Sequence, residues 1–217
     1  MRKTFLFASV LFLMPALSFA VPSVWGVWNP EITENVHILV TPAETGTPLS
    51  AADHPGGGSA DATIRIQLWV DDGDTGTPNP HAVPNFPAED IWLEIPGLTN
   101  CAGGANADGP TDADGWFTFS GPLGMGGWND PDEGPPVVNV IVNGIVLAQA
   151  DWSPISPGIW ANSPDINGDL AVNLTDVAIF AADFFGGYRF ASDLFWDGAI
   201  NLSDIPILAA AVGDVCP

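Results

Sequence analysis

The feature that most constrains this chain is a twelve-residue pattern near its C-terminus that occurs twice, starting at Asp165 and again at Asp193. Both copies have Asp at positions 1, 5 and 12 and Asn at position 9, followed by Leu and then Thr or Ser. Side chains at these offsets, together with the carbonyl at position 7, can surround a calcium ion, which prefers hard oxygen ligands. One such run can be a mere turn, but the same offsets twice are difficult to reach by chance. The sequence therefore predicts two EF-hand-like calcium loops.

The two loops differ in how many oxygen ligands they offer. The predicted ligands of the first loop are Asp165, Asn167, Asp169, the carbonyl of Ala171, Asn173 and Asp176. Those of the second loop are Asp193, Asp197, the carbonyl of Ala199, Asn201 and Asp204. Phe195 stands at position 3 of the second loop, where an oxygen is expected. We therefore expect one strong and one weaker calcium site, and a second loop held by packing alone remains the alternative.

A short helix is predicted after each loop, because apolar residues recur there at helical spacing. The expected inward faces are Val177, Phe180, Ala181 and Phe184 in the first helix, and Ile205, Leu208, Ala209 and Val212 in the second. Gly186-Gly187 and Gly213 follow these segments and are expected to end them, since glycine favours the backbone conformation found just after a helix. The region after residue 164 is too short to bury a large core. Bound metal is therefore expected to contribute much of its stability.

Two loop-helix units in tandem, each reading Asp-x-x-x-Asp-x-x-x-Asn-Leu-Thr/Ser-Asp, resemble the dockerin family over residues 164–213. The resemblance implies a small all-α domain that binds two calcium ions and docks onto cohesin domains of a scaffolding protein. Such modules often bring polysaccharide-degrading enzymes into a complex. The resemblance also implies that Leu174, Thr175, Leu202 and Ser203 face the partner, and that their near-duplication permits two docking orientations.

The region before residue 164 is predicted to be β. Apolar and polar residues alternate at 64–70, and the same period-2 pattern recurs at 36–40 and 91–95. Asn143-Gly144 lies between two apolar runs, which is typical of a two-residue hairpin, because both central residues of a type I′ turn need positive φ. Strands at this spacing, without a convincing helix, predict a β-sandwich.

A short motif indicates which kind of sandwich to expect. The turn 111–115, Thr-Asp-Ala-Asp-Gly, leads into the aromatic strand that starts at Trp116. This motif resembles bacterial immunoglobulin-like domains of the invasin type. The expected fold is therefore mainly β, with an immunoglobulin-like β-sandwich at 21–160 followed by an all-α, dockerin-like pair of loop-helix units at 164–217.

The N-terminus has the order of a secretory signal peptide. Arg2 and Lys3 precede an apolar run at 5–17, and small residues at Ser18 and Ala20 follow it, which predicts a leader at 1–20 cleaved after Ala20. The apolar run is too short to cross a bilayer comfortably. We therefore expect a secreted protein without a membrane span after cleavage, found outside the cell or attached to the cell surface.

Charge and cysteine content agree with an extracellular, calcium-rich setting. The chain has 26 Asp and Glu residues against four Lys and Arg, for a net charge of −22. Such a surface repels nucleic acid and anionic membranes, so neither is expected as a partner. A disulfide between Cys101 and Cys216 is the tentative expectation, because secreted chains rarely keep free thiols. It would tie the β region to the end of the chain.

No catalytic constellation stands out. Acids near strand ends are usually solvated turn residues, and His37, His54 and His81 lack metal-ligand spacing, so a surface or loop role is expected for them. The leading interpretation is a non-catalytic secreted protein whose calcium-binding tail attaches it to a cohesin-like or cell-surface protein, within a polysaccharide catabolic system. A carbohydrate-binding sandwich, with exposed tryptophans that stack on a polysaccharide, is one alternative. A small glycoside hydrolase, with two carboxylates about 5 to 9.5 Å apart, is the other.

Overall fold

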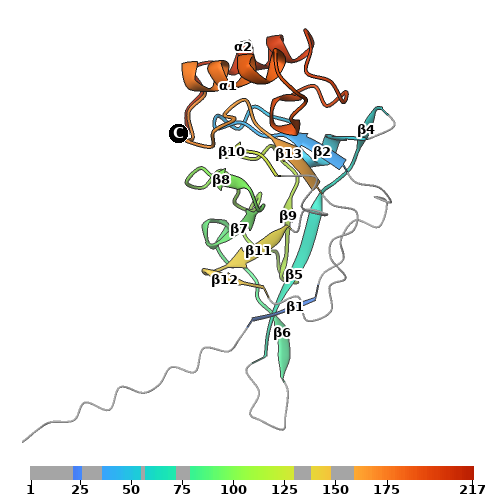
Figure 1. The fold of residues 1–217 in the computed structure, drawn as a ribbon. Helices are drawn as coiled ribbons and strands as arrows, with labels where there is room; N and C mark the ends of the chain where they lie inside the picture. Colours follow the sequence, from blue (N-terminus) through green and yellow to red (C-terminus); the bar gives the residue numbers. More distant parts are fainter. Residues whose placement is uncertain (1–21, 26–35, 55–56, 72–78, 130–137, 148–158) are drawn as a thin grey trace, which may run out of the picture.

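The computed structural model describes residues 22–25, 36–54, 57–71, 79–129, 138–147 and 159–217 (Figure 1). The predicted leader, residues 1–20, lies outside the described residues. The chain is mainly β, as expected, with strands up to Asn162 and two α-helices after it. Within the described ranges, no helix is long and apolar enough to cross a membrane.

The described strands form four small sheets. One contains β1 (Pro22–Trp25), β5 (Ile64–Asp71), β6 (Pro80–Ala82) and β9 (Trp116–Phe119), with β5 as the shared strand. A second contains β2 (Val36–Leu39), β3 (Ala52–Asp53), β4 (Ser59–Ala60) and β13 (Ile159–Asn162). The third contains β7 (Ile91–Glu94), β11 (Asn139–Val142) and β12 (Ile145–Val146), and the fourth contains β8 (Leu98–Asn100) and β10 (Met125–Gly127). The 3-10 helices η1 (Leu49–Ala51), η2 (Ala88–Asp90) and η4 (Phe190–Ser192) lie in connections.

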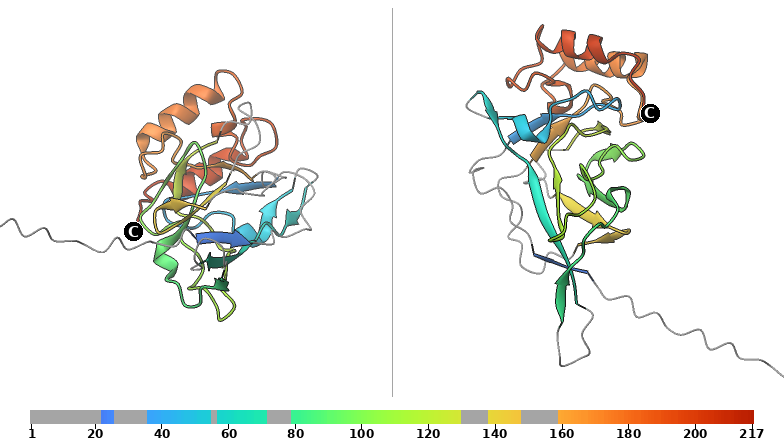
Figure 2. Two further views of the ribbon diagram at one scale, coloured as in Figure 1. Left: turned by 90° about the horizontal axis from the view of Figure 1, so that it is seen from below. Right: turned by 180° about the vertical axis from the view of Figure 1, so that it is seen from behind.

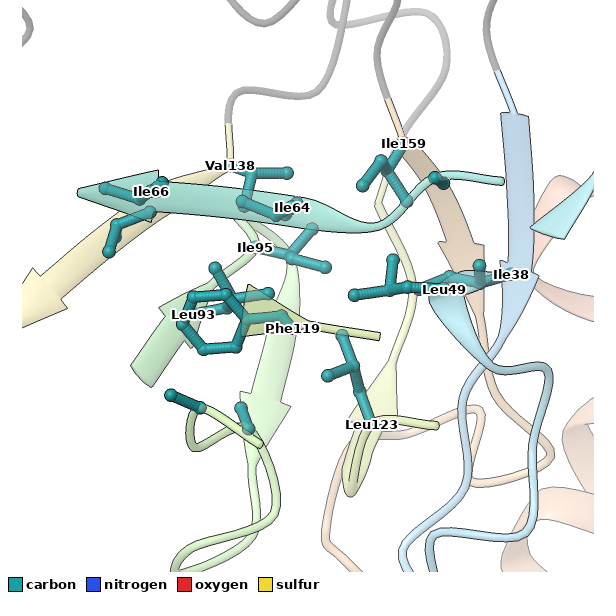
Figure 3. Close-up of a cluster of buried hydrophobic side chains, with 14 of the residues drawn as sticks. Ile38, Leu49, Ile64, Ile66, Leu93, Ile95, Phe119, Leu123, Val138 and Ile159 are labelled. Carbon is teal, nitrogen blue, oxygen red and sulfur yellow. The ribbon is translucent and has the colours of Figure 1, made fainter. Parts of the chain in front are cut away.

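Alternate residues of β2, β5, β7, β9, β11 and β13 point into one common core. In β5, Ile64 and Ile66 are buried whereas Arg65 between them is exposed, because successive side chains of a strand point to opposite faces. Figure 3 shows side chains from β2, β5, β7, β9 and β13 meeting in this core. The strands predicted at 36–40, 64–70, 91–95 and 116–119 are thereby confirmed.

The predicted hairpin is also confirmed. β11 and β12 pair antiparallel on either side of Asn143 and Gly144. These two residues have φ of 49° and 76°, the positive values that a type I′ turn requires at both central positions.

The last strand of the β region leads directly into the first loop. β13 pairs in parallel with β2, so that Ile159 lies opposite Val36 in the sheet that contains the core residues Ile38 and Ala161. In the sequence only Ser163 and Pro164 separate β13 from Asp165, the first residue of the first loop. The loop therefore starts at a fixed point of the β core.

The C-terminal part contains α1 (Leu174–Phe184) and α2 (Asp204–Ala211), which cover one end of the β region, opposite to β1 and β6 (Figures 1 and 2). A second hydrophobic cluster joins the helices to the loops. Its buried members are Ile166, Val172, Phe180, Ala191, Leu194, Leu208 and Ala211. Leu39 and Trp128 of the β region pack against this cluster, so the tail rests on the β region.

The predicted inward faces of both helices are only partly right. Phe180 and Leu208 are buried, but Ala181 and Ala209 are exposed. The other two residues expected to face inward in α2, Ile205 and Val212, are 41% and 47% exposed. The buried residues are instead Asp176, Phe180 and Asp183 in α1, and Asp204, Leu208 and Ala211 in α2. In each helix the buried aspartate at loop position 12 sets the rotation, because its carboxylate must turn toward the loop. The inward face of each helix therefore includes this aspartate and the residues one and two turns after it.

Candidate metal centre

The two loops fold into the same backbone structure around their first aspartate. In the first loop, the N–H groups of Asp169 and Leu170 donate to the Asp165 carboxylate over 3.1 and 2.7 Å. In the second loop, Asp197 and Gly198 donate to Asp193 in the same way, over 3.1 and 2.9 Å. The carboxylate at position 1 thus organises the N–H groups of positions 5 and 6 in both copies.

The aspartate at position 12 closes each loop from the following helix. The Asp176 carboxylate accepts from the N–H groups of Asn167 and Asn173 over 3.2 and 2.9 Å. Asp204 accepts from the N–H groups at the same two loop positions, 3 and 9, over 2.9 and 2.7 Å. The loop and its helix are therefore joined by one carboxylate in each copy.

Positions 5, 7 and 9 also repeat. The N–H of position 7 donates to the aspartate of position 5 over 3.1 Å in both loops. The side-chain amides of Asn173 and Asn201 approach the carbonyls of Ala171 and Ala199 at 3.0 and 3.3 Å. Their oxygens accept from the N–H groups of the residues two positions later. The predicted ligands at positions 7 and 9 therefore lie together in each loop.

Both loops need positive φ at positions 4 and 6, and each supplies glycine at only one of them. The first loop has Gly168 at φ 69° and Leu170 at φ 70°. The second has Trp196 at φ 53° and Gly198 at φ 82°. A residue with a side chain pays a steric cost of about 1 kcal/mol in this region, so each loop carries one strained position.

Four carboxylates are fully buried in these loops. Asp165, Asp176, Asp193 and Asp204 each have 0% of their surface exposed. Burial, with the neighbouring Asp176 and Asp169 adding charge, raises the pKa of Asp165 to about 6. Burial also raises the pKa of Asp193, and hydrogen bonds from Tyr188 and backbone N–H groups oppose that rise.

These carboxylates have no arginine or lysine partner among the described residues. Arg65 lies over the Trp116 ring at 4.6 Å, and Arg189 lies 3.4 Å from Asp183. Buried carboxylates are normally paired or coordinate a metal. The donor set of carboxylates, side-chain amides and backbone carbonyls is the set that calcium prefers, so the residues fit that ion.

The loops differ at position 3. Asn167 joins the first loop: its oxygen accepts from the N–H of Asp169 over 3.0 Å and its amide donates to the Asp169 carboxylate over 2.9 Å. Phe195 offers no such group and is 58% exposed. The second loop instead receives Tyr188, whose hydroxyl donates to Asp193 Oδ2 over 3.0 Å.

The β region supports the first loop closely. A Cβ atom on Gly126 of β10 would lie only 1.8 Å from Asp165 Oδ2, so the backbone of β10 lies directly against that carboxylate. The N–H of Gly127 donates to the carbonyl of Asp165 over 2.7 Å. Cys101, just after β8, and Cys216 form a disulfide with a Cα–Cα distance of 5.5 Å, the pairing that the sequence allowed.

The second loop meets the β region through His37 and Asn162. The Asn162 amide donates to the carbonyls of Phe190 and Asp193 over 3.0 and 2.8 Å, and its oxygen lies 3.0 Å from His37 Nε2. The His37 ring stacks on Trp196 with the ring centroids 4.8 Å apart. The expected surface or loop role of His37 is therefore wrong: it is 1% exposed, within β2.

Sequence reasoning missed Gly126, Tyr188 and the role of His37. Gly126 and His37 precede the loops by many residues in the chain, and no local pattern connects them to the loops. Tyr188 offers one signal in the sequence, since it is the only tyrosine and it lies five positions before Asp193, the first residue of the second loop. A polar aromatic residue there can reach the loop with its hydroxyl.

The residues predicted to face a partner are exposed. Leu174 and Leu202 are 79% and 74% exposed at equivalent positions of the two units, and Thr175 and Ser203 beside them are exposed as well. Six tryptophans whose side chains the structure describes are half-buried: Trp69, Trp92, Trp116, Trp128, Trp160 and Trp196. This part of the chain therefore lacks the exposed aromatic row that sugar stacking would use.

In the described residues, no group of three or more His, Cys, Asp or Glu side chains is placed to hold a metal by itself. A calcium site in these loops would therefore also need the amide and carbonyl oxygens. No family model, no curated protein and no solved structure matches this chain.

Proposed function

We propose that this chain is a secreted calcium-binding protein in which a dockerin-like module at 164–217 follows an immunoglobulin-like β-sandwich at 21–160. In this proposal the module attaches the sandwich to a cohesin-like or cell-surface protein. The observation that carries the proposal is the repetition of the same side-chain-to-backbone hydrogen bonds in both loops, around the buried Asp165 and Asp193.

Calcium would neutralise the carboxylates that burial leaves without cationic partners. In the first loop Asp165, Asn167, Asp169 and Asp176 would hold it, with the Ala171 carbonyl and Asn173. In the second loop Asp193, Asp197 and Asp204 would hold it, with the Ala199 carbonyl and Asn201. The loop residues supply the ligands. The position-12 aspartates belong to α1 and α2 and accept from the N–H groups of loop positions 3 and 9, so they would hold each helix against its calcium-bound loop.

The attachment surface in this proposal consists of Leu174, Thr175, Leu202 and Ser203. The support is that two leucines at equivalent positions are more than 70% exposed, where burial of apolar surface in a complex would be favourable. Each leucine stands two residues before a buried position-12 aspartate. Ordering of the loop by calcium would therefore also fix the position of the leucine next to it.

Calorimetric titration of the full mature chain with calcium tests the metal part of the proposal. Two binding events are expected, the tighter one lost in Asp165→Ala and the weaker one lost in Asp193→Ala. Glu89→Ala, which removes an exposed acid of the β region, is the control and should keep both events. Absence of any binding at millimolar calcium would refute the proposal.

A cohesin-domain panel tests the attachment. Binding is expected with calcium and not with chelator. If two docking orientations exist, Leu174→Asp and Leu202→Asp should each block one orientation and leave the other intact. Each single variant should therefore still bind, and the double variant should not. Binding that survives the double variant would show that the partner uses another surface.

The carbohydrate-binding alternative has less support, because the described tryptophans are half-buried. Of the acids near strand ends, Asp71 and Asp90 are half-buried and Glu89 is exposed, whereas Asp72 and Asp74 lie outside the described residues. The described members of this set, Asp71, Glu89 and Asp90, give no support to the glycoside hydrolase.

A further inference from the structure

Tyr188 lies between α1 and the second loop and is the only tyrosine of the chain. Its hydroxyl donates to Asp193 Oδ2 over 3.0 Å, and the same oxygen accepts from the N–H of Gly198 over 2.9 Å. Asp193 is fully buried and stands at position 1 of the loop. A hydroxyl bonded to a buried carboxylate holds the carboxylate in one orientation, since hydrogen bonds to charged groups are the strong ones.

The carboxylate that receives the hydroxyl also orders the backbone of the second loop. Asp193 accepts from the N–H groups of Asp197 and Gly198 as well as from Tyr188. The Tyr188 side chain is 56% exposed, so its hydroxyl reaches the buried carboxylate from the surface.

Among the described residues, no side-chain hydroxyl makes the corresponding contact with Asp165 in the first loop. The matching oxygen of its first aspartate, Asp165 Oδ2, lies against the Gly126 backbone, where a side chain does not fit. The first loop also has Asn167 at position 3, which orders Asp169. The loop without a polar side chain at position 3 is thus the one that receives a hydroxyl from outside.

We propose that Tyr188 is a positioning residue of the second calcium site: its hydroxyl holds the Asp193 carboxylate and thereby offsets the oxygen that Phe195 does not supply. This inference rests on the proposed function, because it concerns a site that must first bind calcium. It assigns Tyr188 a role in the second site alone, and the first site serves as an internal reference in the same molecule.

Tyr188→Phe removes the hydroxyl and keeps the ring. Calorimetric titration of the full mature chain should then show the second site weakened roughly tenfold, the size expected for one hydrogen bond to a charged group. The affinity of the first site should stay the same. A variant in which both sites weaken equally, or neither does, would overturn the inference.

A double-mutant cycle separates this role from simple packing. Phe195→Asn adds a side-chain oxygen at position 3, so the second loop should depend less on Tyr188. The loss from Tyr188→Phe should therefore be several-fold smaller in the Phe195→Asn background than in the natural chain. Equal losses in both backgrounds would contradict the proposed compensation.

Nuclear magnetic resonance provides a readout at the residue itself. Labelling of tyrosine with ¹³C at the ring carbon that bears the hydroxyl gives a single resonance, because the chain has one tyrosine. That resonance should move as the second, weaker site fills and not as the first fills. Calcium binding at the first loop alone would overturn the inference while the first site of the proposed function stands; no binding at either loop would refute the proposed function.

Discussion

The two loops share one internal structure but have different surroundings. Inside, the aspartates at positions 1 and 12 accept the same four backbone N–H groups in each copy. Outside, the first loop lies against Gly126 and Gly127 of β10, whereas the second receives Tyr188 and stacks Trp196 on His37. The same few acidic positions therefore accompany the same loop structure twice, whereas the contacts around the loop differ, and we expect these contacts to set the calcium affinity of each copy.

The largest expected loss of stability comes from removal of the disulfide, whose Cys216 end lies beside the first loop. The segment before Cys216 runs beside that loop, where Val172 exchanges backbone hydrogen bonds with Gly213 and Asp214. The bond links residues 115 positions apart, and removal of a cross-link over about 100 residues costs about 4 to 5 kcal/mol. The double variant Cys101→Ala, Cys216→Ala should lose about that much free energy of unfolding in urea titration.

The same variant sharpens the comparison of the loops. Its calcium affinity should fall at the first site and change little at the second, because Cys216 donates its N–H to Leu170 of the first loop. An equal loss at both sites would mean that the disulfide stabilises the whole tail and does not favour one loop.

Calcium removal should show the next largest effect. If the first loop works at ~1,000 times its dissociation constant, bound calcium adds about 4 kcal/mol to stability, and at ~100 times about 2.7 kcal/mol for the second. Asp176→Asn should therefore lose more calcium-dependent stability than Asp204→Asn. In chelator both variants should lose only about 1 kcal/mol, for one weakened backbone hydrogen bond. Urea unfolding with and without calcium measures both quantities, and a larger loss in Asp204→Asn would reverse the proposed order of the sites.

Gly126→Ala tests the support of the first loop by the β region. The added methyl group would collide with the Asp165 carboxylate, so we expect a loss of about 2 kcal/mol in unfolding free energy, as for other overpacked sites. The first calcium site should weaken and the second should not. Gly109→Ala is the matched control, because nothing lies within 4 Å of the position of its Cβ. An unchanged first site in Gly126→Ala would show that the loop binds calcium independently of β10.

Phe195→Asn tests the position-3 difference directly. The new side chain should act as Asn167 does in the first loop and should strengthen the second site roughly tenfold, about 1.4 kcal/mol. Calorimetric titration measures this change, with the first site as the reference. If the affinity does not change, the exposed side chain at position 3 lies too far from the ligands to contribute.

The sequence predicts the parts of this structure that local patterns determine. The alternation of Ile64 and Ile66 with Arg65 identifies β5, and Asn143-Gly144 identifies the hairpin of β11 and β12, because hydrophobic period and turn chemistry are local properties. The loop offsets likewise place Asp165 and Asp176 together, since both side chains bond to backbone N–H groups of their own loop.

Local sequence patterns do not predict the contacts between segments that are far apart in the chain. Nothing near Gly126 indicates that Asp165 will lie against it, and nothing near His37 indicates that Trp196 will cover its ring. The sequence also does not predict the full inward face of α2: Leu208 is buried as expected, but Asp204 and Ala211 are buried in place of Ile205 and Val212. Polar residues with a fixed task can thus outweigh apolar periodicity over a short helix.

The smallest expected effect concerns the strained positions, where the two loops should respond with opposite signs. Leu170→Gly relieves a positive φ of 70° and should stabilise the chain by less than about 1 kcal/mol, because glycine also gains freedom in the unfolded chain. Trp196→Gly relieves a φ of 53° but removes the ring that stacks on His37, so it should destabilise. Thermal unfolding in chelator measures both without a contribution from metal. Stabilisation by both variants would mean that the stack on His37 contributes less to stability than the backbone strain at Trp196 costs.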